Sequence, residues 1–454
     1  MKTLLTHATV ITMDPELGDL ADGQVLVEDD RILAVGHDLP SEGAEVVDCG
    51  GGILIPGLVN AHMHTWQTAL RGVAANWTLL EYFGHVHRGL ATLFSPDDIR
   101  IATRMGALNQ LNCGTTTLGD WCHNNPTPEH TDAAIHGLEE SGIRALFFHG
   151  SPKPDPKPGQ PHFSEVPHPR GEVERLLAGS LGDREGRVTL GLAILGPHYS
   201  TLDVTLHDFE LAKEFGLVAS MHQGGGQAVT PGGWDVIEGK GLLGPDINIV
   251  HGQSLSDGQL ARFCEKGVTF SIAPENEMTQ GHGFPITGHV RRHGGVVSLG
   301  VDLESVISGD MFTVARMALG MQRSLDNDAS RRERGGIPET STIRTREALR
   351  WITLDGARAL GLEDRIGSLT PGKQADIVLL DSGQLNMQPV SDPVSTVVMQ
   401  ASLANVDSVM VAGEFHKRDG RLLADIEEGI GQLTASGQRI YAELQSRQPE
   451  EATP

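Results

Sequence analysis

The sequence has few cysteines and no recognisable export signal, and both features indicate the cellular compartment to expect. Four of the 454 residues are cysteine, and they are scattered without a C-x-x-C pair. The N-terminal stretch MKTLLTHATVITMDPE has neither the long apolar centre nor the small-residue cleavage site of a signal peptide. We therefore expect a cytoplasmic protein with free thiols rather than a disulfide framework.

Basic residues and long apolar runs are also scarce. The chain holds 35 Lys and Arg residues against 59 Asp and Glu residues, which gives a formal net charge of -24. Nucleic acids and anionic membranes attract basic surfaces, so this balance argues against either as the main partner. No window approaches the ~20 uninterrupted apolar residues that a membrane-spanning helix needs. We expect no nucleic-acid partner and no membrane partner.

What the sequence does contain is an alternation of short apolar strands with longer helical stretches, from residue 55 to residue 365. This alternation is typical of repeated βα units. The predicted strands are Ile53–Ala61, Thr115–Asp120, Ala145–His149, Thr189–Ile194, Val218–His222, Asn248–His251, Thr269–Ser271 and Val296–Asp302. Eight βα units in a segment of this length predict an α/β fold of the (β/α)₈ TIM-barrel type.

The two ends of the chain have a different pattern, in which short strands alternate with turn residues. We expect both ends to combine into one small β-sandwich. The predicted domains are 1–55 (N-terminal part of the sandwich), 56–365 (barrel), 366–430 (C-terminal part of the sandwich) and 431–454 (C-terminal helix and tail). The proline-dense segment 151–171 is predicted to be a long loop over one face of the barrel.

Histidines and one aspartate stand at the ends of the predicted barrel strands. His62 and His64 are two residues apart, so on a strand they point to the same side. The fifth, sixth and eighth strands end in His222, His251 and Asp302. In a parallel barrel the carboxyl ends of all strands meet at one mouth, where enzymes of this fold act. Four imidazoles and a carboxylate suit Zn²⁺ or Fe²⁺, so we predict a metal site there.

Longer motifs around these residues resemble the amidohydrolase superfamily, in the branch that holds aminohydrolases and chlorohydrolases of N-heterocycles. PGLVNAHMHTWQTALRG is similar to the first metal-binding strand of that family, and CGTTTLGDW is similar to its second strand. LGPHYS resembles the end of the fourth strand, and APENEMTQGHGFP and VSLGVD resemble the seventh and eighth. GSLTPGKQADIVLLD is similar to the sandwich segment. The resemblance covers nearly the whole chain.

The resemblance implies a metal-dependent hydrolase with His62, His64, His222 and Asp302 as metal ligands. One divalent ion, zinc or iron, is expected, because two-metal relatives carry a lysine on strand four and RVTLGLAILG has none. Asp302 would accept a proton from the water that the metal activates. His251 would orient that water or polarise the substrate.

The resemblance also implies a small heterocyclic substrate and a homo-oligomeric assembly. His198 would hydrogen-bond the substrate, although a structural role fits it almost as well. Trp66 and Trp121 follow strand ends and are candidates for stacking on a flat ring, as are Trp77 and Phe83. Core packing explains each of these four aromatic residues equally well.

One position departs from the family pattern. Relatives in this branch usually carry a Glu three residues after the strand-five histidine, where it shuttles a proton to the departing amine. This chain has MHQGGGQ there, so Gly225 occupies the position. An amine is a poor leaving group unless it is protonated, and general acid catalysis contributes about 10²–10⁴-fold. We therefore predict an anionic leaving group, halide or nitro, on an electron-poor ring carbon.

Two alternatives stay open. The first is an aminohydrolase in which another group replaces the missing Glu; the candidates are Gln227, Glu275, His282 and His123, and the first two are also candidates for contact with the substrate. The second is a cyclic-amide hydrolase, which needs the same metal and water. The alternatives share the predicted metal site and differ in the bond that is broken.

Overall fold

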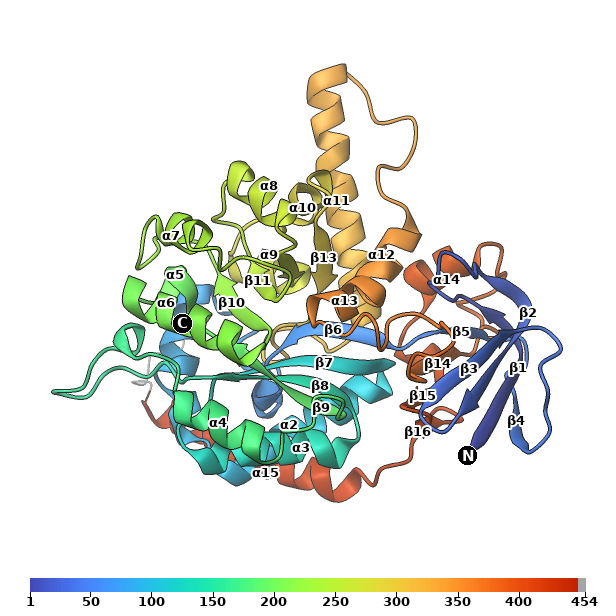
Figure 1. Ribbon diagram of the computed structural model, residues 1–454, viewed down its shortest axis with the longest axis horizontal. Coiled ribbons are helices and arrows are strands. Elements are labelled where there is room, and N and C mark those ends of the chain that lie inside the picture. Colours follow the sequence, from blue (N-terminus) through green and yellow to red (C-terminus); the bar gives the residue numbers. More distant parts are fainter. Residues whose placement is uncertain (448–454) are drawn as a thin grey trace, which may run out of the picture.

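The barrel predicted from the sequence is confirmed. A computed structural model describes residues 1–447 and contains eight parallel strands, hydrogen-bonded to one another in chain order (Figure 1). The strands are β6 (Leu58–Met63), β7 (Thr115–Cys122), β8 (Arg144–Gly150), β9 (Val188–Ala193), β10 (Ala219–Gln223), β11 (Ile247–His251), β12 (Thr269–Ile272) and β13 (Val296–Leu299). Almost all of their side chains are buried, as expected of parallel strands that are covered on both faces.

The barrel closes between β6 and the segment that follows β13. The backbone N–H of His64 donates to the carbonyl of Asp302, and the N–H of Asp302 donates to the carbonyl of His62, each at 2.9 Å. Met63 and Asp302 form the bridge pair between them. Because β13 ends at Leu299, the eighth strand is shorter than predicted, and Asp302 stands in the turn that follows. The closure therefore fixes the backbones of three predicted metal ligands relative to one another.

The first predicted strand, Ile53–Ala61, is wrong as a single element. The structure divides it into β5 (Ile53–Pro56) and β6, with Gly57 between them. β5 belongs to the sheet of the small domain, whereas β6 belongs to the barrel. A Cβ on Gly57 would lie 2.1 Å from Oγ1 of Thr116, so the chain passes β7 too closely for any other residue.

Both chain ends combine into one small β domain, as the sequence predicts, and their strands form one mixed sheet. Its order is β17-β16-β15-β14-β5-β1-β2-β3, and β4 also pairs with β1. Besides β5, the strands are β1 (Lys2–Val10), β2 (Leu20–Glu28), β3 (Arg31–Gly36), β4 (Ala44–Asp48), β14 (Ile377–Leu380), β15 (Val406–Val411), β16 (Glu414–Arg418) and β17 (Arg421–Leu422). β14 lies antiparallel to β5, so the two ends of the chain share one sheet and one core.

Helices cover the outside of the barrel (Figure 1). The helices of the described residues are α1 (Leu79–Tyr82), α2 (Pro96–Asn112), α3 (Pro128–Ser141), α4 (Arg170–Ala178), α5 (Gly196–Tyr199), α6 (Leu202–Phe215), α7 (Gly233–Gly239), α8 (Asp257–Glu265), α9 (Pro274–Gln280), α10 (Thr287–Arg292), α11 (Met311–Arg334), α12 (Thr345–Trp351), α13 (Leu354–Ala359), α14 (Pro393–Gln400) and α15 (Glu427–Arg447). α2 begins where the sequence directs it, because Ser95 and Asp98 form a capping box and Pro96 takes the first position.

The C-terminal helix predicted from the sequence is α15, which packs on α2. The predicted tail at 448–454 lies outside the described residues. Within residues 1–447, no helix combines the length and the apolar character that crossing a bilayer requires.

The proline-dense segment after β8 is a loop, as predicted. Residues 151–162 form no helix or strand, and a 3-10 turn at Phe163–Glu165 precedes α4. Part of the loop extends away from the barrel (Figure 1). Its beginning lies at the barrel mouth, where Lys153 is 7% exposed.

Candidate active site

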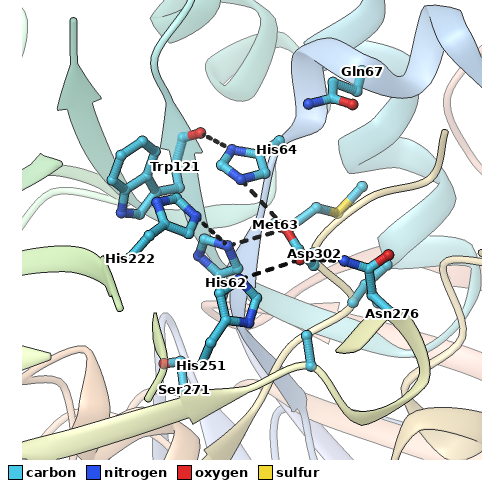
Figure 2. A network of polar contacts seen from close by, with 12 residues as sticks. His62, Met63, His64, Gln67, Trp121, His222, His251, Ser271, Asn276 and Asp302 are labelled. Atoms are coloured by element: carbon cyan, nitrogen blue, oxygen red, sulfur yellow. Dashed lines mark hydrogen bonds and ion pairs between the residues drawn. The ribbon is translucent and has the colours of Figure 1, made fainter. Parts of the chain in front are cut away.

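Five polar side chains meet at one mouth of the barrel (Figure 2). His62 and His64 come from the end of β6, His222 from β10 and His251 from β11, and Asp302 follows β13. All except His222 are 3% exposed or less. The structure thus brings together every residue that the sequence assigned to the metal site.

The spacing of their donor atoms fits a metal ion. Nε2 of His62 lies 3.2 Å from Nε2 of His222 and 3.2 Å from Oδ1 of Asp302. The same oxygen is 3.4 Å from Nε2 of His64, and Oδ2 is 3.6 Å from Nε2 of His251. Bonds of about 2.0–2.2 Å to a tetrahedral ion would place its ligand atoms about 3.3–3.6 Å apart. Four of the donors lie within 4.8 Å of one another: those of His62, His222, His251 and Asp302.

Hydrogen bonds on the outer ring nitrogens turn two of the imidazoles toward the centre. Nδ1 of His64 donates to the backbone carbonyl of Trp121 at 2.5 Å, so its Nε2 keeps a lone pair that faces inward. Nδ1 of His251 donates to Oε1 of Glu277 at 3.0 Å, with the same result. Glu277 is fully buried. Both rings are therefore held in the tautomer that a metal site needs.

The carboxylate of Asp302 is also held in place. Nδ2 of Asn276 donates to its Oδ2 at 2.6 Å, which leaves Oδ1 facing His62 and His64 (Figure 2). Asp302 and His251 both have left-handed backbone conformations, with φ of 67° and 70°. Such conformations are uncommon outside glycine and cost about 1–3 kcal/mol each where they are strained, and they cluster at functional sites.

The protonation states of these residues suit a cation. Burial lowers the pKa of His62 to about 4 and holds the pKa of His222 well below its usual value. Burial alone would raise the pKa of Asp302, but its contacts with His62 and His64 outweigh burial and hold that pKa well below the usual range. Burial also opposes a charge on His251, but the bond to Glu277 outweighs it and raises the pKa of His251. The site therefore offers an ionised carboxylate and basic ring nitrogens.

A cavity opens beside the five residues, with a volume of about 380 Å³ that includes its open mouth. Besides members of the metal site, it is lined by Leu79, Tyr82, Phe83, His87, His123, Lys153, Tyr199, Gln280, His282 and Leu303. Five of these side chains are Leu, Tyr or Phe, and the other five are His, Lys or Gln. A pocket that combines apolar and aromatic surface with a small number of polar groups is typical of small-molecule sites.

The two tryptophans predicted to contact the substrate have different environments. Trp121 lies against His222, with ring centroids 4.2 Å apart, and so adjoins the metal site. Trp66 lies outside the cavity lining: it is fully buried and packs on Phe94 with ring centroids 5.2 Å apart, which is the core packing that the sequence left open. The chain after His64 turns into a 3-10 helix, Thr65–Leu70, whose buried face carries the Trp66 side chain into the core.

Three other predicted substrate contacts lie outside the lining of the cavity as the structure describes it: His198, Gln227 and Glu275. His198 is 5% exposed, and its Nδ1 lies 3.3 Å from Nε2 of Gln223. Gln227 is exposed on the loop after β10, and Glu275 is half-buried in the first turn of α9. Phe83, in contrast, does line the cavity.

Sequence reasoning missed four residues that shape the site: Asn276, Glu277, Lys153 and Tyr199. Asn276 and Glu277 belong to APENE, directly after β12, so they follow a strand end just as the metal ligands do. Their position directly after a predicted strand could have identified them from the sequence as candidate site residues. Lys153 and Tyr199 lie in loop and short-helix segments whose path no periodicity in the sequence specifies.

A (β/α)₈ barrel with a buried histidine–aspartate site at the carboxyl ends of its strands defines a metal-dependent hydrolase. The chain belongs to the amidohydrolase family, whose family model matches residues 53–416. The family resemblance found in the sequence is thereby confirmed, and the protein is a hydrolase of that family.

Two enzymes named as deaminases are similar to this chain over nearly its whole length. The 5'-deoxyadenosine deaminase of Methanosarcina mazei is 27% identical, with 98% of this chain and 99% of the relative covered. The 5-methylthioadenosine/S-adenosylhomocysteine deaminase of Moorella thermoacetica is 28% identical over 95% of this chain and 98% of the relative.

Among solved structures, atrazine chlorohydrolase from Arthrobacter aurescens TC1 complexed with zinc has a TM-score of 0.84 and 24% identity, covering 96% of this chain and 100% of that one. An adenosine deaminase from Xanthomonas campestris with bound zinc has a TM-score of 0.81 and 24% identity, covering 97% and 98%. These likenesses support the fold.

Proposed function

We propose that the protein hydrolyses a small N-heterocycle by displacing an anionic group, a halide or a nitro group, from an electron-poor ring carbon. The observation that carries the proposal is Gly225, which offers no side chain where relatives of this branch have a proton-shuttling Glu. The choice of an N-heterocycle draws on the relatives, which are named for deoxyadenosine, adenosine and atrazine.

The donor set suits one divalent ion, zinc or iron, with His62, His64, His222 and Asp302 as its ligands. Such an ion, when bound, lowers the pKa of a water molecule to roughly 7, so that a nucleophile is available at neutral pH. Asp302 is ionised and buried, and it takes up the proton of the attacking water. His251 presents Nε2 to the same space and orients the water by accepting a hydrogen bond from it.

The four residues that the sequence offered in place of the missing Glu are poor candidates for a proton donor. Gly225 itself has no side chain, and Gln227 and Glu275 lie outside the cavity lining. His123 and His282 line the cavity, but burial lowers the pKa of both, that of His282 to about 3, so each is neutral at pH 7. A group that leaves as a stable anion needs no proton donor.

The second candidate function is an aminohydrolase. Several relatives are named as deaminases, which favours it. The cavity also contains Lys153, and burial lowers the pKa of its ammonium to about 8, close to the range of an effective general acid. In that case Lys153 would protonate the departing amine in place of the missing Glu.

A substrate panel separates the two candidates. Metal-loaded enzyme is given pyrimidines and triazines that carry chloro, nitro or amino at one fixed ring position, and release of chloride, nitrite and ammonia is measured. We expect kcat/KM for the chloro or nitro members to exceed that for the amino members by about 10²-fold, the lower end of a general acid's contribution. Release of ammonia alone would contradict the proposal and favour the aminohydrolase.

Restoring the missing carboxyl group provides a second test. A Cβ on Gly225 would meet only the carbonyl oxygen of His282, at an ordinary 3.6 Å, so a side chain can begin there without a clash at its Cβ. We expect Gly225→Glu to raise ammonia release from the amino members by about 10-fold or more, with little gain for the chloro members. Gly225→Gln is the matched control, since it has the same size and no acidic proton. Equal gains in both variants would contradict the prediction.

A further inference from the structure

The wall of the cavity contains a buried ammonium group without a counter-charge. Lys153, which follows β8, is 7% exposed and lines the cavity. Its Nζ lies 4.7 Å from the ring centroid of Tyr199 and 5.5 Å from that of Trp121. Within residues 1–447 it has no ion-pair or hydrogen-bond partner, and burial alone moves its pKa, to about 8. The group is therefore still charged at neutral pH.

Other deeply buried side-chain charges within residues 1–447 have polar partners; Lys417, for example, donates to the backbone carbonyl of Asn112 at 2.8 Å. Arg144 donates to Asp376 at 2.9 Å, and Arg71 donates to Glu304 at 2.8 Å. An unpaired buried ammonium is unfavourable, and contacts with aromatic faces offset only part of that cost. Lys153 therefore has the properties of a side chain whose partner arrives from outside the protein.

The charge balance of the cavity also favours an anion. Among the lining residues Asp302 is the carboxylate and Lys153 the ammonium, and burial lowers the pKa values of His87, His123 and His282. A divalent cation at Asp302 would leave the cavity net positive. The chain as a whole has a net charge of -24, so a positive cavity runs against its general composition.

We propose that Lys153 binds a carboxylate on the heterocyclic substrate, so that the enzyme selects anionic rings over neutral ones. A carboxylate accepts hydrogen bonds from the ammonium group and supplies the missing counter-charge. The rings of Tyr199 and Trp121 flank the ammonium and restrict where it can lie, which sets the position of the carboxylate relative to the metal site. The inference rests on the proposed function for the heterocycle alone, and it requires nothing of the leaving group.

Binding of two unreactive probes tests this inference without turnover. Nicotinate and nicotinamide share a pyridine ring and differ in charge, and isothermal titration of the zinc-loaded protein gives Kd for each. We expect the wild-type protein to prefer nicotinate, and Lys153→Met to weaken nicotinate binding by at least ~10-fold, which is about 1.4 kcal/mol. Nicotinamide binding should stay within about twofold. Lys153→Arg should retain most of the nicotinate affinity, and Lys157→Met, at an exposed position in the same loop, should match the wild type.

Three results would overturn the inference. If the wild-type protein binds nicotinate and nicotinamide equally, the cavity has no anion site. This comparison uses the wild-type protein alone, so it does not depend on whether a variant folds. If Lys153→Met leaves nicotinate binding unchanged, the carboxylate goes to the metal instead. If that variant loses both probes equally while keeping its zinc and its circular dichroism spectrum, Lys153 only shapes the cavity. Because no arm involves a leaving group, a failure of the substrate panel would leave this inference standing.

Discussion

Two side chains outside the set of predicted metal ligands, Glu277 and Asn276, fix the orientation of His251 and Asp302 by hydrogen bonds. Glu277 accepts a hydrogen bond from Nδ1 of His251 at 3.0 Å and another from the backbone N–H of Ala273 at 3.0 Å. It thus ties the ring of His251 to the first turn of α9. Asn276, one residue earlier, donates to Asp302. Two adjacent residues therefore position the two side chains to which we assign roles in activating water.

This arrangement predicts the effect of neutralising Glu277. In Glu277→Gln the amide oxygen still accepts from His251, but the negative charge that raises the pKa of His251 is lost. Changes in such supporting partners cost about 10–100-fold in activity or metal affinity, and we expect kcat/KM to fall in that range while the fold is retained. Steady-state kinetics and elemental analysis measure the effect. Glu265→Gln, on the exposed end of α8, is the control, and equal activity of the two variants would contradict this role.

The metal donors themselves give a stricter prediction. We expect His64→Ala and Asp302→Asn each to reduce turnover to background, because the first removes a ligand and the second cannot take up a proton. The two should differ in metal content: His64→Ala loses the metal, whereas an amide in place of Asp302 still offers an oxygen. Elemental analysis of the purified variants separates ligand loss from proton-transfer loss. Full metal occupancy with retained activity in either variant would contradict the assigned role.

The strands of the barrel were predictable because each is an apolar run between turn signals. The same pattern located the metal site, since a parallel barrel brings all strand ends to one mouth whatever the loops do. It failed at Ile53–Ala61, where one continuous apolar run serves two sheets and only Gly57 marks the division. It left open where Trp66 and Lys153 lie, because their places depend on how the chain turns after a strand ends. Periodicity describes elements, and loop paths depend on tertiary contacts.

The division at Gly57 leads to a stability prediction. A methyl group there would overlap Oγ1 of Thr116, which is fully buried on β7, so β5 or β7 would have to shift. Overpacking of this kind costs about 1–3 kcal/mol, and we expect Gly57→Ala to lower the free energy of unfolding by that amount. Urea denaturation followed by circular dichroism measures it. Gly244→Ala is the control, because nothing lies within 4 Å of the added Cβ. An equal urea midpoint for the two variants would contradict the close approach of Gly57 to Thr116.

In the whole molecule, the metal site and the small domain lie at opposite ends of the barrel. The site is built at the carboxyl ends of the strands, whereas Arg144, which pairs with Asp376 beside β14, stands at the amino end of β8. α11 and the loop after it project from the body, and Ile337 in that loop is 64% exposed (Figure 1). The homo-oligomer expected from the resemblance stays a prediction.

A buried ion pair connects the barrel with the small domain. Nε of Arg144 donates to Oδ2 of Asp376 at 2.9 Å, its Nη2 donates to Oδ1 at 3.0 Å, and both side chains are 2% exposed. The backbone N–H of Ala412, in the turn between β15 and β16, also donates to Oδ1, at 2.8 Å. The carboxylate therefore holds a barrel strand and the terminal sheet together.

Removing one charge of the Arg144–Asp376 pair should lower the free energy of unfolding far more than removing both charges, because a lone buried charge has no water to solvate it. We expect Arg144→Met to lower the free energy of unfolding by about 3–5 kcal/mol, and Arg144→Met with Asp376→Asn to recover a large part of that loss, since the asparagine oxygen still accepts from Ala412. Urea midpoints of the two single variants and the double variant measure the coupling. The exposed pair of Arg418 with Glu45, 2.8 Å apart, is the control, and Arg418→Met should cost less than about 1 kcal/mol. A loss for Arg144→Met no larger than for Arg418→Met would contradict the role of this ion pair in holding the two domains together.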